Sequence, residues 1–452
     1  MKKIKIGLVG LGVVGKSVYE ILLKDKKIID TRSACELELV AVSARSKKDF
    51  IDETKVKFFA NALDLANDPA IDVIVEVIGG DGIAREVCEA ALKNGKKVVT
   101  ANKALIAARG FELAKLADAH QSDIFFEAAV GGATPMVKVF KEALAANEIK
   151  EFYAILNGTC NYILTKMKNE NVDFAAALQE AQDLGYAESD PTFDIEGIDS
   201  AHKLAILAAI ASGSKPQFDD IFVEGITKIT IDDIRLAQEL GYKIKLLGVY
   251  KNGGACRAVY PALVSVSEKI ANVDESFNAL FTKSSNAGDS LIIGSGAGGL
   301  PTASAIVADL IDIANGRHNF IFGIKTENLV EAQISKIEDR LGRYFIKLIL
   351  DKKLAQEQKL DQQFLRDIKV EKSYFCEKKN FVKSVNSALE NKSFFQLKTE
   401  NQNSVESENE QVICALLTSD IKEKDLINLL KNLDKNLAKE AKFLRVEETK
   451  GA

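Results

Sequence analysis

The chain contains 452 residues and carries a net charge of −5 at pH 7, and this length predicts two or three domains because one hydrophobic core rarely organises more than about 300 residues. Its hydrophobic fraction of 47% and charged fraction of 28% are those of an ordinary globular protein. The negative net charge disfavours a nucleic-acid partner. No apolar run approaches the roughly 20 residues that cross a bilayer, and no signal-peptide core follows Met1. We therefore expect a cytoplasmic protein without a membrane partner.

The first third of the chain alternates strand-like and helix-like segments. Strands are predicted at 4–9, 38–43, 72–78, 97–100 and 124–127. Helical periodicity lies between several of them, at 13–24, 85–94 and 111–119. This alternation indicates an α/β fold with a Rossmann-type, doubly wound parallel sheet. We assign it to residues 1–133 and expect a returning segment near 300–325 to complete it.

The rest of the chain has an α+β pattern. In residues 134–299, helices are predicted at 135–146, 173–184, 199–212 and 231–240, and strands at 152–156, 245–250, 257–266 and 290–293. A helix at 301–315 follows. Residues 340–452 form a third, small α+β domain, with strands at 344–350, 412–417 and 443–446, helices at 359–368 and 421–433, and a solvated loop at 398–411.

The first strand runs into a glycine motif, G-x-G-x-x-G, formed by Gly10-Leu11-Gly12-Val13-Val14-Gly15. Such glycines often only make a turn, but here they follow a strand and open a helix, which is the context of a dinucleotide site. Gly10 would permit the tight turn, Gly12 would let the pyrophosphate approach the backbone, and Gly15 would let helix and strand pack closely. Unpaired N–H groups at the helix start would bind the phosphates. All six residues are predicted to bind the cofactor.

The end of the second strand bears on the choice of nicotinamide cofactor. An NAD site usually has an acidic residue there, which binds the ribose 2′-hydroxyl. This chain instead has Arg45, Lys47 and Lys48. Arg45 suits a 2′-phosphate through forked hydrogen bonds, so NADP is predicted, with NAD also usable. The alternative is that these cations form an ordinary solvated loop.

A second candidate cluster follows the strand at 97–100, in the string Thr100-Ala101-Asn102-Lys103. Ligands of doubly wound sheets bind at the carboxyl ends of the strands. Lys103 therefore stands where a functional residue is expected, although a surface role is the default for any single lysine.

The segment from Leu184 to Lys203 is the richest in charged residues. A solvated acidic loop is the plain interpretation, but the apolar helix that follows Lys203 indicates that this lysine lies at the edge of a core. Asp199 and Lys203 are four residues apart and share a helix face, so the carboxylate can position the ammonium and tune its proton affinity. Glu188 and Asp194 could bind a cationic amino group. The set suggests an amino-acid substrate and a proton-transfer step.

Taken together, these segments resemble homoserine dehydrogenases over about residues 1–325. The likeness rests on five ordered strings: Thr100-Ala101-Asn102-Lys103, Glu127-Ala128-Ala129-Val130-Gly131-Gly132, Asn157-Gly158-Thr159-Cys160-Asn161-Tyr162-Ile163, Leu184 to Lys203, and Gly296-Ala297-Gly298-Gly299-Leu300-Pro301-Thr302-Ala303-Ser304. The resemblance implies the reduction of L-aspartate 4-semialdehyde to L-homoserine, a step of threonine, methionine and isoleucine biosynthesis. It also implies that residues 134–299 bind the substrate and form a homodimer or homotetramer.

The resemblance further implies residue roles. Lys203 would be the general acid and Lys103 the second catalytic lysine. Glu188 and Asp199 would bind the substrate in a pocket lined by Tyr186, Asp190 and Asp194, and the cofactor would also contact Thr100, Lys103, Gly185 and Gly298. A monovalent cation, expected to be sodium, would bind Glu127 and the backbone carbonyls of Val130, Gly132 and Thr134.

The implied chemistry needs a proton donor and no covalent nucleophile, because hydride addition to the aldehyde leaves negative charge on its oxygen. Aldehyde-oxidising relatives act instead through an activated cysteine. Here Cys160 is the one cysteine inside a matched string, and no histidine adjoins it in the sequence. With six scattered cysteines and three histidines, a cysteine–histidine metal site is not expected either.

The tail at 340–452 resembles the regulatory ACT module that follows many members of this family. It departs from the module's pattern, since Asp351-Lys352-Lys353-Leu354 lacks the Asp-x-Pro-Gly effector loop, and this puts threonine feedback in doubt. No kinase segment precedes the glycine motif, so a monofunctional enzyme is expected. Two alternatives stay open: another amino-acid or sugar dehydrogenase with the same nucleotide domain, and a nucleotide-sensing regulator without turnover.

Overall fold

The computed structural model describes residues 3–318, 320–351, 362–377, 384–386, 411–433 and 438–449. Its amino-terminal region contains a six-stranded sheet with the order β3-β2-β1-β4-β5-β6, in which every pairing is parallel. The strands are β1 (Lys3–Val9), β2 (Glu36–Ser43), β3 (Lys57–Phe59), β4 (Val73–Glu76), β5 (Lys97–Thr100) and β6 (Ile124–Phe125). This is the order of a Rossmann fold, and it confirms the predicted fold class.

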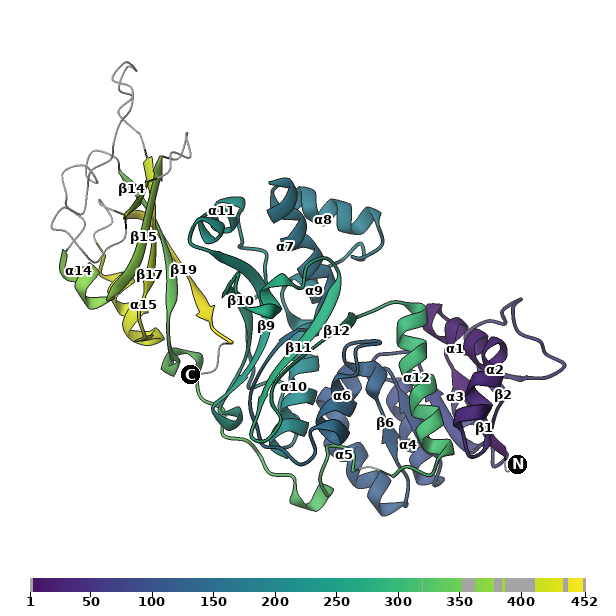
Figure 1. Ribbon diagram of the computed structural model, residues 1–452. Coiled ribbons are helices and arrows are strands. Elements are labelled where there is room, and N and C mark those ends of the chain that lie inside the picture. Colours follow the sequence, from purple (N-terminus) through teal and green to yellow (C-terminus); the bar gives the residue numbers. More distant parts are fainter. Residues whose placement is uncertain are drawn as a thin grey trace.

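Helices cover both faces of this sheet (Figure 1). They are α1 (Val13–Lys24), α2 (Lys26–Arg32), α3 (Ala62–Asn67), α4 (Ile83–Lys93), α5 (Lys103–Ala119) and, returning from much later in the chain, α12 (Gly299–Ala314). In Figure 1, α12 lies beside α1. Ile306 and Leu310 of α12 share one buried cluster with Val18 of α1 and Leu8 of β1. The region around the parallel sheet is thus built from two segments that are far apart in the sequence.

The middle region is a mixed sheet with helices packed against it. Its strands are β7 (Ile149–Ile155), β8 (Phe222–Val223), β9 (Tyr242–Lys251), β10 (Cys256–Ser265), β11 (Phe277–Ser284) and β12 (Gly288–Ser295). Its helices are α7 (Gly158–Glu170), α8 (Phe174–Asp183), α9 (Thr192–Ile195), α10 (Ile198–Ser212) and α11 (Ile231–Glu239). Helix α10 is buried on almost every face from Asp199 to Ile210, so the charged side chains it carries are held inside the core.

The tail joins this sheet as an extension of it. It contains β13 (Leu341–Gly342), β14 (Tyr344–Asp351), α14 (Gln362–Asp367), β15 (Val370–Glu377), β16 (Ser384–Asn386), β17 (Gln411–Thr418), β18 (Ile421–Lys422), α15 (Glu423–Lys431) and β19 (Ala438–Glu447). Strand β19 pairs in parallel with β10, from Ala262↔Arg445 to Val264↔Glu447. Among the described residues, the two regions therefore form one sheet of 11 strands, and this continuity was not anticipated from the sequence.

Buried ion pairs reinforce the junction between the tail and the middle region. Asp233 on α11 is fully buried and lies 2.6 Å from the ammonium groups of both Lys347 and Lys442, which belong to β14 and β19. The Glu447 carboxylate accepts hydrogen bonds from Arg340 at 2.6 Å and from Tyr260 on β10 at 2.7 Å. Buried charges are stable only when paired, so these contacts specify one docking position for the tail.

The predicted helix at 135–146 is wrong as a single element. Only Met136–Lys138 is α-helical, and a wide π-helical turn follows over Val139–Ala143, in which the Leu144 N–H bonds to the Val139 carbonyl.

Helix α7 and strand β11 were not predicted, because neither has a clear apolar period. The loop expected at 398–411 lies outside the described residues except for Gln411, which begins β17. Lys352–Leu354, where the effector-loop pattern is missing, also lie outside the described residues.

Within the described part of the chain, no helix is both long and apolar enough to cross a membrane.

Candidate active site

The glycine motif forms a bare turn between β1 and α1. Gly10 has a φ of +108°, and a Cβ there would lie 2.9 Å from the Val77 carbonyl oxygen. A Cβ on Gly15 would lie 1.9 Å from the Gly10 oxygen, so only glycine lets the helix approach the turn. A Cβ on Gly12 would meet nothing within 4 Å, and no side chain caps α1. The turn therefore leaves open space and unpaired N–H groups where a pyrophosphate would bind.

The later glycine string lies against the same helix start. A Cβ on Gly299 would lie 2.9 Å from the Val13 side chain, and Gly298 before it has a φ of +115°. A Cβ on Gly132 would lie 2.7 Å from the Gly296 backbone. The structure thus brings Gly298 beside the glycine motif. Leu11 is buried and Val14 is half-buried, whereas Val13 is 75% exposed.

Sequence reasoning missed one buried carboxylate, that of Glu76. It lies where the strand order of the parallel sheet changes direction. Glu76 ends β4 and is fully buried. Its carboxylate accepts N–H bonds from Ile78 at 2.8 Å and Gly79 at 2.9 Å, and the Thr100 hydroxyl donates to it at 2.6 Å. The Asn102 amide donates to the Gly80 carbonyl at 2.7 Å. Thr100 is therefore buried, and its hydroxyl helps to hold the loop that follows β4. The feature of the sequence that could have identified Glu76 is a carboxylate at the end of an apolar strand.

Two lysines from different regions meet at one buried carboxylate. Lys203 Nζ lies 2.7 Å from Asp199 Oδ2, on the same face of α10, and Lys103 Nζ at the start of α5 lies 3.1 Å from Asp199 Oδ1. Lys203 also donates to the Leu156 carbonyl at 2.7 Å. Burial alone would raise the pKa of Asp199, but the charges of Lys203 and Lys103 outweigh it and hold this pKa well below its usual range. Asp199 therefore stays ionised between two ammonium groups.

Asn157, the N-cap of α7, connects this centre to the acidic segment. Its Nδ2 donates to Asp199 Oδ2 at 2.9 Å and to Asp194 Oδ1 at 2.7 Å. Burial and the neighbouring Asp199 charge raise the pKa of the half-buried Asp194. On the other side, Asn278 donates to the Leu156 carbonyl that Lys203 also contacts. Asn157 and Asn278 had no predicted role, although Asn157 lies inside a matched string.

The segment before α9 is exposed beside this centre. Gly185 has a φ of +76° and open space around it. The ring of Tyr186 lies 4.8 Å from that of Tyr162 on α7, and the Glu188 side chain is exposed. The Asp190 carboxylate accepts the Thr192 N–H at 3.1 Å, and hydrogen bonding from the Thr192 side chain and backbone lowers the pKa of Asp190. Asp194 is thus bonded to this centre through Asn157, whereas Glu188 and Tyr186 are exposed and Asp190 helps to begin α9.

The basic cluster lies at the carboxyl end of β2. Arg45, Lys47 and Lys48 are all exposed. Lys47 is paired with Glu53 at 2.7 Å, which leaves Arg45 and Lys48 as the cations that the described structure does not pair.

Glu127 is buried at the end of the parallel sheet. Its carboxylate accepts the N–H groups of Val137 at 3.2 Å and Lys138 at 2.7 Å, and its own N–H donates to Asp309 on α12. Burial and the Asp309 charge raise the pKa of Glu127 to about 8. In the adjoining loop the Gly131 and Thr134 carbonyls accept the N–H groups of Thr134 and Met136. The described residues hold no group of three or more acidic, histidine or cysteine side chains that would suit a multivalent metal.

Comparisons with known proteins identify the same family along most of the chain. Two family profiles match, one described as "Homoserine dehydrogenase, NAD binding domain" over residues 10–127 and one described as "Homoserine dehydrogenase" over residues 135–311. The homoserine dehydrogenase of Pseudomonas aeruginosa is 44% identical over 315 residues, 69% of this chain and 73% of that protein. The chain belongs to the homoserine dehydrogenase family. The predicted family is confirmed.

Solved homoserine dehydrogenases share the fold over nearly the whole chain. The structure from Thiobacillus denitrificans is 35% identical, with a TM-score of 0.84 over 99% of both chains. A hyperthermophilic archaeal homoserine dehydrogenase in complex with NADPH is 28% identical, with a TM-score of 0.61 over 70% of this chain and 99% of that one. As a homoserine dehydrogenase, the chain is an NAD(P)-dependent oxidoreductase that acts on a CH–OH group.

The one cysteine inside a matched string has no features of a nucleophile. Cys160 is fully buried, and its thiol donates to the Asp194 carbonyl at 3.2 Å. Burial, with the nearby Asp194 and Asp199 charges, raises the pKa of this thiol well above its usual value. A thiol held in its neutral form is a weak nucleophile, so the geometry favours hydride chemistry over covalent aldehyde oxidation.

Proposed function

We propose that the chain reduces L-aspartate 4-semialdehyde to L-homoserine with Lys203 as the proton donor and NADPH as the preferred cofactor, in the biosynthesis of threonine, methionine and isoleucine. The observation that carries this proposal is the Asp199 carboxylate, which holds Lys203 at 2.7 Å and Lys103 at 3.1 Å from opposite sides. Two ammonium groups fixed at one point are suited to stabilise a developing alkoxide.

Lys203 has a donor left for the substrate oxygen. An ammonium carries three N–H groups, and two of those on Lys203 bond to Leu156 and Asp199, which leaves one that the described residues do not use. When bound, the reduced nicotinamide supplies the hydride to the aldehyde carbon. Lys203 transfers its proton to the carbonyl oxygen, so the aldehyde becomes an alcohol. Lys103 stabilises the charge on that oxygen, and solvent returns a proton to Lys203.

Carboxylates at the open edge of the centre suit the substrate's ammonium group. Glu188 is exposed and Asp194 is half-buried, and with Asp199, Tyr186 and Asp190 they form the proposed pocket. Burial and the Asp199 charge raise the pKa of Asp194, and a bound cation would favour its ionised form.

The cofactor is proposed to lie across the bare turn at residues 10–15, between Gly185 and Gly298. Arg45 is proposed to bind the 2′-phosphate, while Thr100 and Lys103 approach the nicotinamide end. The open space at Gly12 supports this placement. Residues 1–133 with 300–325 would form the nucleotide domain, residues 134–299 the substrate and dimerisation domain of a homodimer or homotetramer, and 340–452 an ACT-like domain.

A sodium ion is proposed beside Glu127, with the carbonyl oxygens of Val130, Gly132 and Thr134 as further ligands. These hard oxygen donors fit such an ion, and so does the raised pKa of Glu127, because burial and the Asp309 charge outweigh the opposing charge of Lys138.

The test is a spectroscopic assay of the purified full chain. NADPH oxidation should depend on aspartate 4-semialdehyde, NADH should support a slower reaction, and homoserine should reverse it. A sugar or another amino-acid semialdehyde that reacts faster would contradict the substrate assignment, and binding of NADPH without turnover would favour a nucleotide-sensing regulator.

A further inference from the structure

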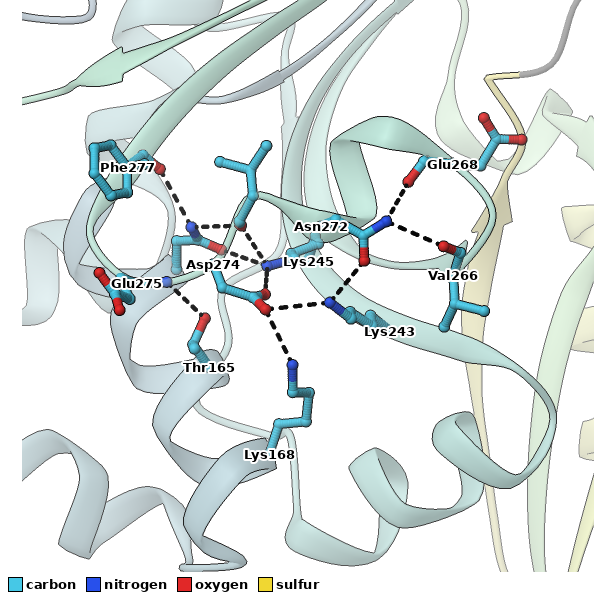
Figure 2. A network of polar contacts seen from close by, with 12 residues as sticks. Thr165, Lys168, Lys243, Lys245, Val266, Glu268, Asn272, Asp274, Glu275 and Phe277 are labelled. Carbon is cyan, nitrogen blue, oxygen red and sulfur yellow. Dashed lines mark hydrogen bonds and ion pairs between the residues drawn. The ribbon is translucent and has the colours of Figure 1, made fainter.

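A cluster of three lysines around one carboxylate lies outside the proposed active site (Figure 2). Asp274, in the loop between β10 and β11, is 3.1 Å from Lys168 on α7, 3.2 Å from Lys243 and 2.8 Å from Lys245, both on β9. The three lysine side chains are only 18%, 15% and 2% exposed. Lysines are rarely buried to this extent without full compensation, so the cluster calls for an explanation.

The cluster carries surplus positive charge. Three ammonium groups face one carboxylate, which leaves two positive charges uncompensated within it. Burial, together with the charges of Lys243 and Lys168, lowers the pKa of Lys245 to about 8 against the opposing effect of Asp274. The adjacent Glu275 does not compensate this charge, because Figure 2 shows its carboxylate directed away from the lysines.

The hydrogen-bond donors of the cluster are incompletely used. Lys245 uses all three N–H groups, on Asn161, Val273 and Asp274. Lys243 uses two, on Asn272 and Asp274, and Lys168 uses one, on Asp274. Each ammonium has three donors, so among the described residues one donor of Lys243 and two of Lys168 remain without an acceptor. The unused donors are on the two more exposed lysines.

Lys168 and Lys243 line a small surface pocket that opens to solvent, and Lys245 and Asp274 are also in its wall. Helix α7 supplies Leu164 and Thr165 to its wall, α11 supplies Ile234 and Gln238, and β9 supplies Ile244 beside the two lysines. A concave site with apolar walls and a few convergent polar groups has the general form of a small-ligand site.

We propose that this pocket binds a compact oxyanion, a carboxylate or phosphate group, through Lys168 and Lys243. The anion would accept the unused N–H donors and neutralise the surplus charge, with Gln238 able to donate a further hydrogen bond. Asp274 holds the two lysines in place at the wall of the pocket, and Lys245 has no N–H group left for the ligand. The site is separate from the catalytic lysines, and it does not depend on the proposed reaction.

The pocket adjoins the catalytic centre through α7. Asn161, which accepts from Lys245 at 3.0 Å, lies one helical turn after Asn157, which donates to Asp199 at 2.9 Å. Asn161 also donates to the Phe277 carbonyl, directly before Asn278. A ligand in the pocket would therefore contact the same helix that positions the active-site carboxylates.

The test is calorimetric titration of the full chain with inorganic phosphate at constant ionic strength, and separately with acetate. Excess NADP⁺ is present throughout, so that any cofactor phosphate site is filled. We expect saturable binding of at least one anion, and the comparison of the two shows whether phosphate or carboxylate is preferred. Lys168→Gln should weaken this binding about tenfold or more, because it removes two of the three unused donors.

Lys166→Gln is the matched control. Lys166 lies on the same helix and is 15% exposed, but it pairs with both Glu170 and Glu180, so its loss should leave anion affinity unchanged. Asp274→Asn should lower thermal stability, because the three lysines lose their carboxylate partner, and added phosphate should recover part of that loss. A purely structural cluster would lose the same stability without any recovery by the anion.

A measurement on the unmodified chain covers the case in which a variant fails to fold. Bound anion should protect Lys168 and Lys243 from acetylation, read by mass spectrometry, while Lys166 keeps its labelling rate. Absence of saturable binding for both anions, or equal effects of Lys168→Gln and Lys166→Gln, would overturn the proposal.

Discussion

Replacement of Lys203 by methionine tests the proposed proton donor with little change in side-chain volume. The variant loses two 2.7 Å hydrogen bonds, to Asp199 and to the Leu156 carbonyl. Asp199 keeps Lys103 at 3.1 Å and Asn157 at 2.9 Å. We therefore expect a stability loss below the roughly 3–5 kcal/mol seen when a buried charge loses its only partner, and the chain should still fold.

The catalytic effect should be far larger than the structural one. General acid catalysis contributes on the order of 10²–10⁴-fold, or about 3–5 kcal/mol of barrier. NADPH affinity, measured by fluorescence titration, should stay within about twofold, because Lys203 lies on the substrate side. Lys203→Arg separates proton transfer from charge: a guanidinium keeps the positive charge but does not release its proton, so turnover should stay low there too.

Turnover of Lys203→Met within tenfold of the unmodified chain would refute the assignment. So would a loss of NADPH affinity as large as the loss of rate, since that would place Lys203 in the cofactor site. Full activity of Lys203→Arg would show that charge, and not proton donation, is what the reaction needs.

Four further predictions concern binding and stability. Arg45→Ala should weaken NADPH binding by up to about fivefold, as expected of an exposed charge pair worth about 0–1 kcal/mol, and leave NADH binding unchanged; equal weakening of both would place Arg45 in an ordinary surface loop. Glu188→Gln should raise the Michaelis constant for homoserine roughly 10- to 100-fold, because a charge-assisted hydrogen bond is worth about 1.5–3 kcal/mol, and an unchanged constant would exclude this contact. Because the pKa of Glu127 is raised to about 8 in the folded chain, the folded chain holds an extra proton between about pH 4.5 and 8. Without sodium, the unfolding free energy should therefore fall as pH rises through this window, and the fall should be absent in Glu127→Gln. Sodium should stabilise the unmodified chain more at pH 9 than at pH 6. Asp233→Asn should lower the unfolding free energy, measured in urea, by about 3–5 kcal/mol, since Lys347 and Lys442 would lose their buried partner; a loss below about 1 kcal/mol would show that these ion pairs do not secure the tail.

Local sequence patterns determined the nucleotide-binding half of this fold. Strand-like runs alternating with helical periodicity predicted the parallel sheet, and the predicted strand at 97–100 coincides with β5 (Lys97–Thr100). The predicted helix at 199–212 differs from α10 (Ile198–Ser212) by one residue, so the spacing of Asp199 and Lys203 was readable in advance. These features depend on residues within one or two turns of each other, which is why periodicity can report them.

Elements without a clear apolar period escaped prediction. Helix α7 (Gly158–Glu170) contains asparagine and threonine among its buried positions, and its start depends on the Asn157 cap, whose side chain accepts the Cys160 N–H at 2.8 Å. Strand β11 (Phe277–Ser284) buries almost every residue, so it shows no alternation of apolar and polar positions, and it pairs with β7 and β12 within the sheet. Its neighbours, and not its own sequence, make it a strand.

Only the tertiary structure decided which distant groups meet. The sequence placed Lys103 at the end of a strand and Asp199 on a helix, but their 3.1 Å contact depends on how α5 packs against α10. Two further contacts join segments that are tens to hundreds of residues apart. One is the parallel pairing of β19 with β10, and the other is the convergence of Lys168, Lys243 and Lys245 on Asp274. Such contacts depend on how separately formed elements bury their apolar faces together, and no local spacing encodes that arrangement.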